Sequence, residues 1–363
     1  MINGVARDNS SKLGSPLTST LIPNDLKNTS NILLLIFWSF LCLAFFALDL
    51  ILGSVHISLS EIREIFSGAA DDSGLWHIIY NFRLPKAITA LLTGSALAVA
   101  GLFMQTLFQN PLAGPYVLGI SSGASLGVAL LLMGGAFLPA ALVASTWAQV
   151  SAAIIGSLLV LLLVLGVSSR VNDTVSLLIV GMMFGSIAGS IVNVLQSASN
   201  ADSLKLFVMW SMGSLSSVTW QFLNVMAPII TICLALSLFL PKKLNALLLG
   251  ERYARGLGVS IGGIKITTII LCCLLAGTAT AFTGPIAFIG MAVPHIVRGM
   301  FRTSDHRIVL PACIIVGASL LTLCDIISQM PWSDAVLPIN SVSSLIGAPI
   351  ILWVIFKNKH LHS

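Results

Sequence analysis

Long apolar runs alternate with short polar stretches along most of this chain. A helix needs about 20 apolar residues to cross the hydrocarbon core of a bilayer. Candidate spans of this kind cover residues 32–52, 86–104, 115–134, 147–167, 175–195, 221–240, 263–283, 285–301, 308–328 and 342–356. The third and tenth are short and interrupted by Gly and Pro, which a bundle tolerates where the helix packs on protein or lines a cavity. The pattern predicts an all-α polytopic membrane protein with ten transmembrane helices.

The composition agrees with this fold class. Of 363 residues, 56% are hydrophobic and 9% are charged, and the mean hydropathy is +1.00, whereas a soluble domain carries about 25% charged residues. We expect a polar N-terminal tail at residues 1–31, a transmembrane domain at 32–357 and a short tail at 358–363. The first tail is not expected to be a cleaved signal peptide, because it is long and Asp49, rather than a small-residue cleavage site, follows the first apolar run.

Basic residues are distributed unequally between the two sides that ten spans define. The side that holds both termini carries fourteen of them: Arg7, Lys12, Lys27, Arg170, Lys242, Lys243, Arg252, Arg255, Lys265, Arg298, Arg302, Arg307, Lys357 and Lys359. The opposite side carries four: Arg63, Arg83, Lys86 and Lys205. The positive-inside rule therefore predicts cytoplasmic termini. The net charge of +5 reflects this topology and does not indicate nucleic-acid binding.

The longest cytoplasmic connection, residues 241–265, reads PKKLNALLLGERYARGLGVSIGGIK. Three leucines at helical spacing predict one short helix that Gly250 can end. The following ERYAR predicts a second helix, which Gly256 and Gly258 can close. A long connection with structure of its own usually has a partner.

On the outer side, residues 53–85 form the longest connection. Its alternation of charged and apolar residues predicts an amphipathic surface helix near residues 59–67. A second is expected within residues 197–220, where Trp210 and Trp220 suit the depth of the membrane interface.

In the fifth span, Gly181, Gly185 and Gly189 recur every four residues, a spacing that allows close helix packing. A neighbouring face of the same span carries Ser186, Ser190 and Asn193. Because a polar stripe in lipid is costly, this face should meet protein or water. It can line a path or form hydrogen bonds between helices, and the residues alone do not choose between the two.

No catalytic motif stands out. The sequence contains no GxxxxGK[ST] phosphate loop, and no nucleophile triad, paired-carboxylate or metal-ligand spacing. The six cysteines lie in apolar spans without a CxxC pair, so reduced packing residues are expected. His295 and Asp325, near span ends, are expected to be satisfied structural groups. We therefore predict no enzyme activity, no cofactor and no metal site.

Arg83 and Lys86 lie one turn apart where the second span begins on the outer side. Such cations can anchor a helix by snorkelling or contact an acidic partner surface. The bare sequence favours anchoring.

Four stretches of the chain, in this order, resemble the FecCD-type permeases of iron–siderophore, cobalamin and haem ABC importers. They are RLPKAITALLTGSALAVAGLFMQTLFQNPLAGPYVLGISSGASLG (83–127), LLLGERYARGLGV (247–259), GPIAFIGMAVPHIVRGMFRTSDHRIVLPA (284–312) and LPINSVSSLIGAPIILWVIF (337–356). The resemblance covers about residues 32 to 357. It implies a ten-helix subunit of the bacterial inner membrane.

The resemblance also implies partners: a second permease copy or paralogue, two cytoplasmic ABC ATPase subunits and a periplasmic substrate-binding protein. Residues 241–265 match the coupling helices that sit in a groove of the ATPase. The matching contact residues are Leu249, Gly250, Glu251, Ala254, Arg255, Leu257 and Gly258. Arg83 and Lys86 match a basic rim that docks the binding protein. The fifth span lines the path in relatives, which favours that role for Ser186, Ser190 and Asn193.

The sequence departs from the family pattern at three positions. Gln109 stands where many relatives have Arg or Glu, Gln329 replaces a basic residue often found after Asp325, and Asn340 stands where Gly is usual.

We therefore expect an inner-membrane permease that moves an iron–siderophore complex into the cytoplasm, with cobalamin or haem as alternative cargo. The rivals are an ion-coupled secondary carrier, which the lack of a mid-span charge argues against, and a membrane scaffold that transports nothing.

Overall fold

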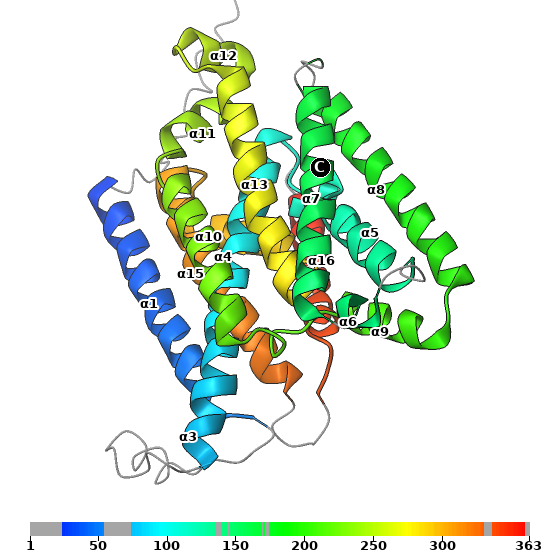
Figure 1. The fold of residues 1–363 in the computed structure, drawn as a ribbon. Helices are drawn as coiled ribbons and strands as arrows, with labels where there is room; N and C mark the ends of the chain where they lie inside the picture. Colours follow the sequence, from blue (N-terminus) through cyan, green and yellow to red (C-terminus); the bar gives the residue numbers. More distant parts are fainter. Residues whose placement is uncertain are drawn as a thin grey trace, which may run out of the picture.

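The computed structural model describes residues 24–53, 74–134, 139–143, 145–168, 170, 174–329 and 336–359. Within these ranges the regular structure is helical throughout (Figure 1). Ten apolar helices follow the ten predicted spans. They are α1 (Asn24–Ile51), α4 (Leu84–Leu107), α5 (Ile120–Leu132), α7 (Thr146–Ser168), α8 (Thr174–Ala198), α10 (Trp220–Ser237), α13 (Ile261–Thr283), α14 (Ile289–Phe301), α15 (His306–Ser328) and α16 (Ile339–Lys359).

Seven of the described helices are long and apolar enough to cross a membrane, and α5, α14 and α16 contribute shorter apolar stretches. Two of these short helices, α5 and α16, correspond to the third and tenth spans, which the sequence predicts to be short. Helix α14 begins only at Ile289, because Phe288 adopts a left-handed backbone with φ 66°. An L residue in this region interrupts the regular helix.

Within the described residues, seven smaller elements connect these helices. They are α3 (Gly74–Ile78), the π-helix η1 (Ile79–Arg83), the 3-10 helix η2 (Pro115–Leu118), α6 (Ala140–Val143), α9 (Ala201–Ser211), α11 (Pro241–Leu248) and α12 (Glu251–Gly256). Helix α9 confirms the helix predicted within residues 197–220, whereas the one predicted near residues 59–67 lies outside the described residues. Helix α1 begins at Asn24, inside the tail expected at residues 1–31.

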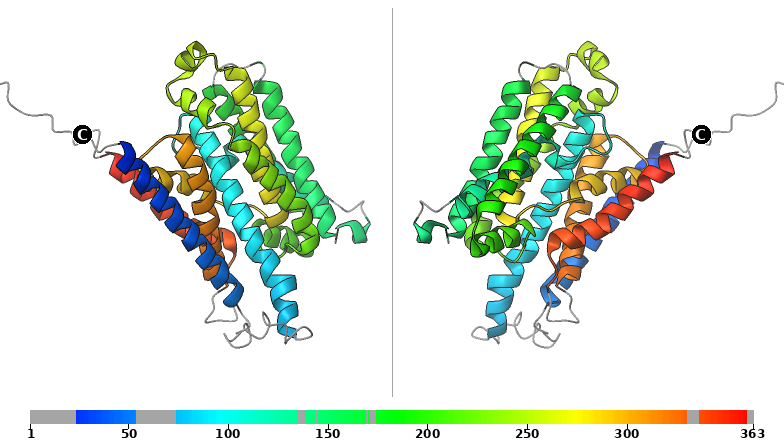
Figure 2. Two further views of the ribbon diagram at one scale, coloured as in Figure 1. Left: turned by 90° about the vertical axis from the view of Figure 1, so that its left-hand side faces the viewer. Right: turned by 90° about the vertical axis from the view of Figure 1, so that its right-hand side faces the viewer.

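The helices are tilted against one another, with α1 and α16 on one flank and α7 and α8 on the other (Figure 2). Helices α11 and α12 project from one end, and α3 and α9 lie toward the opposite end (Figure 1). The first turns of α1 and the last turns of α16 lie toward the end that carries α11 and α12 (Figure 2). This is the end that the charge count assigns to the cytoplasm.

Helix α4 is the central helix of the bundle and packs against α15, α13, α14 and α10. Its sequence is rich in Ala and Gly, so neighbouring backbones approach closely. A Cβ on Gly94 would overlap the carbonyl oxygen of Gly317 in α15, and one on Gly101 would overlap that of Gly290 in α14. Small residues therefore fix where α4 crosses its two neighbours.

Glycines of the third span and the glycine repeat of the fifth span also serve packing. Gly123 and Gly127 of α5 meet the backbone of α7, and Gly181 of α8 lies against the backbone of η2. Gly119, between η2 and α5, has φ 78°, a conformation that glycine adopts without strain. A Cβ at Gly189 would meet nothing within 4 Å, so the repeat is in contact along only part of its length.

Candidate functional site

Residues 241–258, here called the coupling segment, fold as two short helices at the cytoplasmic end. Helix α11 begins at Pro241, and its Leu244 and Leu247 are buried against the bundle. Gly250 (φ 97°) joins it to α12, and Gly258 (φ 78°) follows α12. Both glycines hold backbone conformations that other residues adopt only with strain. The two helices predicted from the sequence are confirmed.

The coupling segment presents apolar side chains outside the membrane spans. Leu249 is 63% exposed, and Tyr253 and Leu257 are each 58% exposed. Leu257 directly follows α12, and its N–H donates a 3.1 Å hydrogen bond to the carbonyl of Tyr253, four residues earlier. The two side chains therefore share a face. The Glu251 and Arg255 side chains, also exposed, approach each other to 3.9 Å.

Of the predicted contact residues, Ala254 alone points inward, since its exposure is 0%. Tyr253 was not among the contact residues predicted from the sequence. Its spacing of four residues from Leu257 was the signal that could have identified it. Exposed large apolar side chains of this kind mark contact surfaces when they gather in one place.

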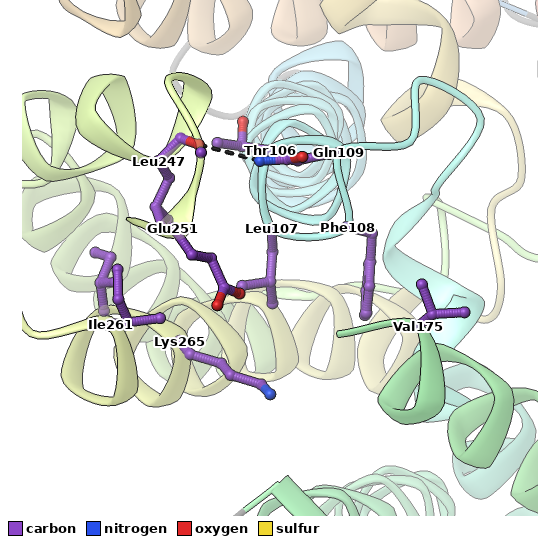
Figure 3. Close-up of a pocket in the computed structure, with 11 residues that line it drawn as sticks. Thr106, Leu107, Phe108, Gln109, Val175, Leu247, Glu251, Ile261 and Lys265 are labelled. Atoms are coloured by element: carbon purple, nitrogen blue, oxygen red, sulfur yellow. Dashed lines mark hydrogen bonds between the residues drawn. The ribbon is translucent and has the colours of Figure 1, made fainter. Parts of the chain in front are cut away.

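A cavity of about 260 Å³ separates part of the coupling segment from the bundle. Figure 3 shows that residues from the end of α4, the start of α8, the coupling segment and the start of α13 line it. Glu251 and Lys265 contribute groups of opposite charge, and Leu107 and Phe108 contribute apolar ones. Beside this space, the amide of Gln109 donates a hydrogen bond of 3.1 Å to the Leu247 carbonyl.

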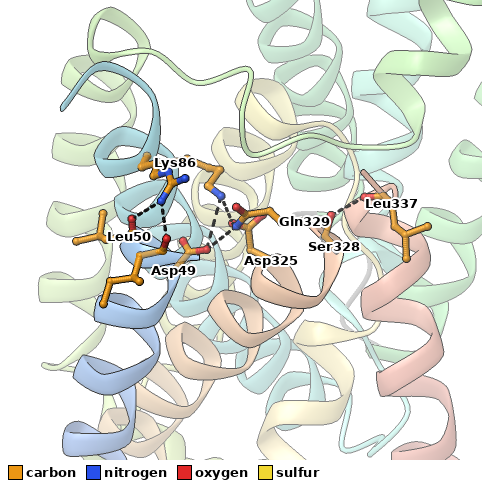
Figure 4. Close-up of polar contacts among 9 residues, drawn as sticks. Asp49, Leu50, Lys86, Asp325, Ser328, Gln329 and Leu337 are labelled. Atoms are coloured by element: carbon orange, nitrogen blue, oxygen red, sulfur yellow. Dashed lines mark hydrogen bonds and ion pairs between the residues drawn. The ribbon is translucent and has the colours of Figure 1, made fainter. Parts of the chain in front are cut away.

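At the outer end, three ionisable side chains and one amide meet in the outer cluster: Asp49 of α1, Lys86 of α4, and Asp325 with Gln329 at the end of α15 (Figure 4). The Lys86 ammonium lies 2.9 Å from Asp325 and 3.6 Å from Asp49. The Gln329 amide donates to Asp49 at 2.7 Å and to Asp325 at 3.1 Å. The departure at Gln329 thus places a neutral donor between two carboxylates.

Arg83 lies beside the outer cluster and donates hydrogen bonds to the carbonyls of Leu50 and Ile51 at 2.9 and 2.6 Å. Arg83 is 6% and Lys86 5% exposed. Neither side chain lies along the surface as a snorkelling anchor does. Both are held among helix ends.

The predicted polar face of α8 is exposed in the single chain. Ser186, Ser190 and Asn193 all lie on the surface, among exposed Met and Ile side chains. The hydroxyls of Ser186 and Ser190 donate to carbonyls of α8 itself, each at 3.0 Å. These two serines therefore do not need another helix as acceptor, although a hydroxyl stripe facing lipid remains unfavourable.

The other residues that the sequence singled out are structural. A ring nitrogen of His295 lies 2.6 Å from the Pro111 carbonyl. Asn340, at the start of α16, accepts a 2.9 Å hydrogen bond from the N–H of Ala287. The departure at Asn340 therefore ties α16 to the loop before α14.

Comparison with known proteins identifies the family to which the chain belongs. The FecCD transport family matches residues 41–357. The chain belongs to this family. The hemin transport system permease protein HmuU of Yersinia pestis is 37% identical over 317 residues, which cover 86% of this chain and 94% of the relative. The vitamin B12 import system permease protein BtuC of Klebsiella pneumoniae is 37% identical over 282 residues, covering 77% of this chain and 83% of the relative.

A solved structure, an inward-facing conformation of a metal-chelate type ABC transporter, matches with a TM-score of 0.80 and 29% sequence identity, covering 89% of this chain and 99% of that one. This FecCD protein is thus a multi-pass protein of the bacterial inner membrane and a permease subunit of an ABC importer. In such an importer ATP hydrolysis lies in separate subunits.

Proposed function

We propose that this FecCD permease moves a bulky metal chelate from the periplasm to the cytoplasm, with an iron–siderophore complex as its first candidate cargo. The metal-chelate importer of similar fold supports this class of cargo. Haem and cobalamin are the alternatives, supported by the hemin and vitamin B12 permeases among the relatives.

The observation that carries the proposal is the coupling segment. It is folded, it lies at the cytoplasmic end, and it exposes Leu249, Tyr253 and Leu257 outside the membrane spans. An amphipathic helix that lays its apolar face in a groove is a common mode of protein recognition. In our proposal two ATPase subunits dock here, one on each copy of a permease dimer, and their closure on ATP moves the segment.

The polar face of α8 supports the second half of the proposal. Ser186, Ser190 and Asn193 are exposed in one chain and would be placed in lipid unless another surface faced them. We propose that a second permease, identical or paralogous, faces α8 across the path. A path lined by hydroxyls and apolar groups binds its cargo weakly, which suits a ligand that must also leave.

For the periplasmic binding protein, the proposed docking residues are still Arg83 and Lys86. Their burial changes the expectation for this contact. Lys86 is already paired with two carboxylates, so less of its charge is available to an acidic partner surface. Docking should therefore depend only modestly on salt concentration.

Capture of the ATPase tests the proposal. Leu257→Asp places a charge in the proposed apolar contact and should abolish co-purification of an ATPase subunit without changing membrane insertion. Ser304→Asp is the matched control, since it adds a carboxylate at an exposed position on the same side and should leave capture intact. Equal capture by both variants would remove the coupling role. Failure of the unaltered protein to capture any ATPase would favour a secondary carrier or a scaffold.

The cargo can be assigned by uptake into cells that lack and then regain this gene. We expect a labelled ferric siderophore to accumulate only in the complemented cells. Accumulation of labelled haemin or cobalamin instead would select the corresponding alternative.

A further inference from the structure

The last turn of α4 and the turn that follows it (residues 105–109) make a separate polar contact with each of three neighbouring elements. Gln105 accepts a 2.6 Å hydrogen bond from Arg298 of α14, Thr106 lies 2.8 Å from a ring nitrogen of His306 in α15, and Gln109 donates to Leu247 of α11. These residues thus lie where the coupling segment meets the bundle, and we call them the α4 hub.

The contact between α11 and α15 is a continuous chain of hydrogen bonds. The amide NH2 group of Asn245 in α11 donates to the Asp305 carboxylate at 2.6 Å, so that the Asn245 amide oxygen faces His306. The Asn245 oxygen accepts from the His306 backbone N–H at 2.9 Å and lies 2.8 Å from Nδ1 of the His306 ring. In a neutral imidazole Nδ1 then carries the proton and Nε2 is an acceptor. The Thr106 hydroxyl oxygen lies 2.8 Å from Nε2 and 2.8 Å from the Leu102 carbonyl oxygen, so its one proton is shared between these two acceptors.

Asp305 anchors this chain as a carboxylate. It caps the start of α15 by accepting from the Arg307 N–H at 2.9 Å. Burial acts to raise the pKa of Asp305, but hydrogen bonds from Arg307 and Asn245 outweigh it and hold the pKa below its ordinary value. Helix α11 is therefore hydrogen-bonded to the first turn of α15, and through His306 to the last turn of α4.

Helices α4 and α15 are also joined elsewhere along their length. They cross with backbones in contact at Gly94 and Gly317. The hydroxyl of Ser95 donates to the Ile314 carbonyl at 2.9 Å, and at the outer end Lys86 pairs with Asp325 at 2.9 Å. Two helices held at both ends and at their crossing should move as one body.

A cavity of about 260 Å³ lies between Glu251 of α12 and the end of α4. Helix α11 instead contacts α15 and the end of α4 directly, so a displacement of α11 must strain the contacts at Asn245 and Leu247.

We propose that His306 is the positioning residue through which α11 moves α4 and α15 together, so that the α4 hub carries ATPase motion to the outer cluster. This inference rests on the proposed function, because it presumes an ATPase at the coupling segment. It adds Asn245, Thr106 and His306 to the residues on which coupling depends.

The experiment compares matched threonines in the complete transporter, reconstituted with its ATPase and binding protein. Thr106→Val removes the hydroxyl that contacts His306, and Thr106→Ser restores it. Thr322→Val is the control, since that buried hydroxyl, like the one of Thr106, donates to a carbonyl of its own helix, here Ala318 at 2.9 Å. Asn245→Ala breaks the same chain from outside the membrane spans. The readouts are ATP hydrolysis and uptake of whichever of haemin, cobalamin and a ferric siderophore the unaltered transporter carries.

We expect Thr106→Val and Asn245→Ala to hydrolyse ATP but to lower the cargo moved per ATP by about fivefold or more, with Thr106→Ser and Thr322→Val close to the unaltered protein. An unchanged ratio in Thr106→Val would overturn the inference, as would a parallel loss of hydrolysis and uptake that Thr106→Ser does not rescue. If the unaltered complex neither binds an ATPase nor moves any of the three probes, the proposed function fails instead.

Discussion

The two ends of the α4–α15 pair are held by different chemistry. At the outer end Lys86 lies between two carboxylates, whereas at the cytoplasmic end Thr106 meets His306 through a hydrogen bond between uncharged groups. A buried charge without its partner is very costly, so the outer contact can be broken only at high cost. A hydrogen bond between neutral groups contributes about 1 kcal/mol net, so the inner contact adds less to the stability of the fold. The comparison indicates that the outer contacts mainly stabilise the fold, whereas the inner contacts transmit the movement of α11 to α4 and α15.

The strongest test of the outer end is Lys86→Met, which leaves Asp49 and Asp325 without their shared cation. We expect it to lower the free energy of unfolding by on the order of 3 kcal/mol, measured as a fall in the thermal unfolding midpoint in detergent. Lys205→Met is the control, because Lys205 is exposed on α9 and should change little.

A double variant separates charge from packing at the outer end. Lys86→Met with Asp325→Asn removes one of the stranded carboxylates and should recover part of the lost stability. If the double variant is as unstable as Lys86→Met alone, the stranded charge is not the cause.

The crossing between the two ends is tested by Gly94→Ala. Its Cβ would overlap the Gly317 carbonyl oxygen, and the resulting backbone shift should cost about 1–3 kcal/mol. Gly299→Ala, at a helical glycine whose Cβ meets nothing within 4 Å, should instead stabilise by up to about 1 kcal/mol. Thermal unfolding should therefore shift in opposite directions. A shift in the same direction would mean that the helices do not cross there.

At the inner end, Asn245→Ala removes one donor and one acceptor from a partly exposed position. We expect a loss of about 1 kcal/mol in unfolding free energy, well below that of Lys86→Met. Thermal unfolding of the two variants under the same conditions gives the ranking. A larger loss for Asn245→Ala would contradict the expectation that the outer contacts stabilise the fold more than the inner ones.

The smallest effect on stability is expected for Arg255→Ala on the coupling segment. Its ion pair with Glu251 is exposed, and such pairs contribute about 0.5 kcal/mol or less. The unfolding midpoint should stay the same while ATPase capture weakens. A clear loss of stability would show that Arg255 supports the fold rather than the contact.

The sequence predicted the ten apolar helices because each is encoded in a local run of hydrophobic residues. It also predicted α11 and α12, because leucine spacing and glycines at Gly250 and Gly258 are local signals. The start of α14 was predicted too early, at residue 285, because no residue near Phe288 indicates a left-handed backbone at that position.

The polar contacts were largely missed, because they join residues far apart in the chain. Asp49 and Lys86 meet Asp325 only after three helices pack, and no periodicity connects Asn245 with His306. A signal did exist in the positions of the outer residues, since Asp49, Lys86 and Asp325 all lie at the ends of apolar spans that the predicted topology places on the same side. The predicted position of each residue across the membrane, taken together with the hydropathy, therefore groups these three residues.

The central claim is that this permease opens and closes under the control of an ATPase that it does not itself contain. The direct measurement is uptake of a labelled chelate into vesicles that hold the permease, with or without ATPase subunits and enclosed ATP, and with the binding protein outside. We predict uptake only when the ATPase and ATP are both present. Uptake by the permease alone in response to an ion gradient would contradict the account.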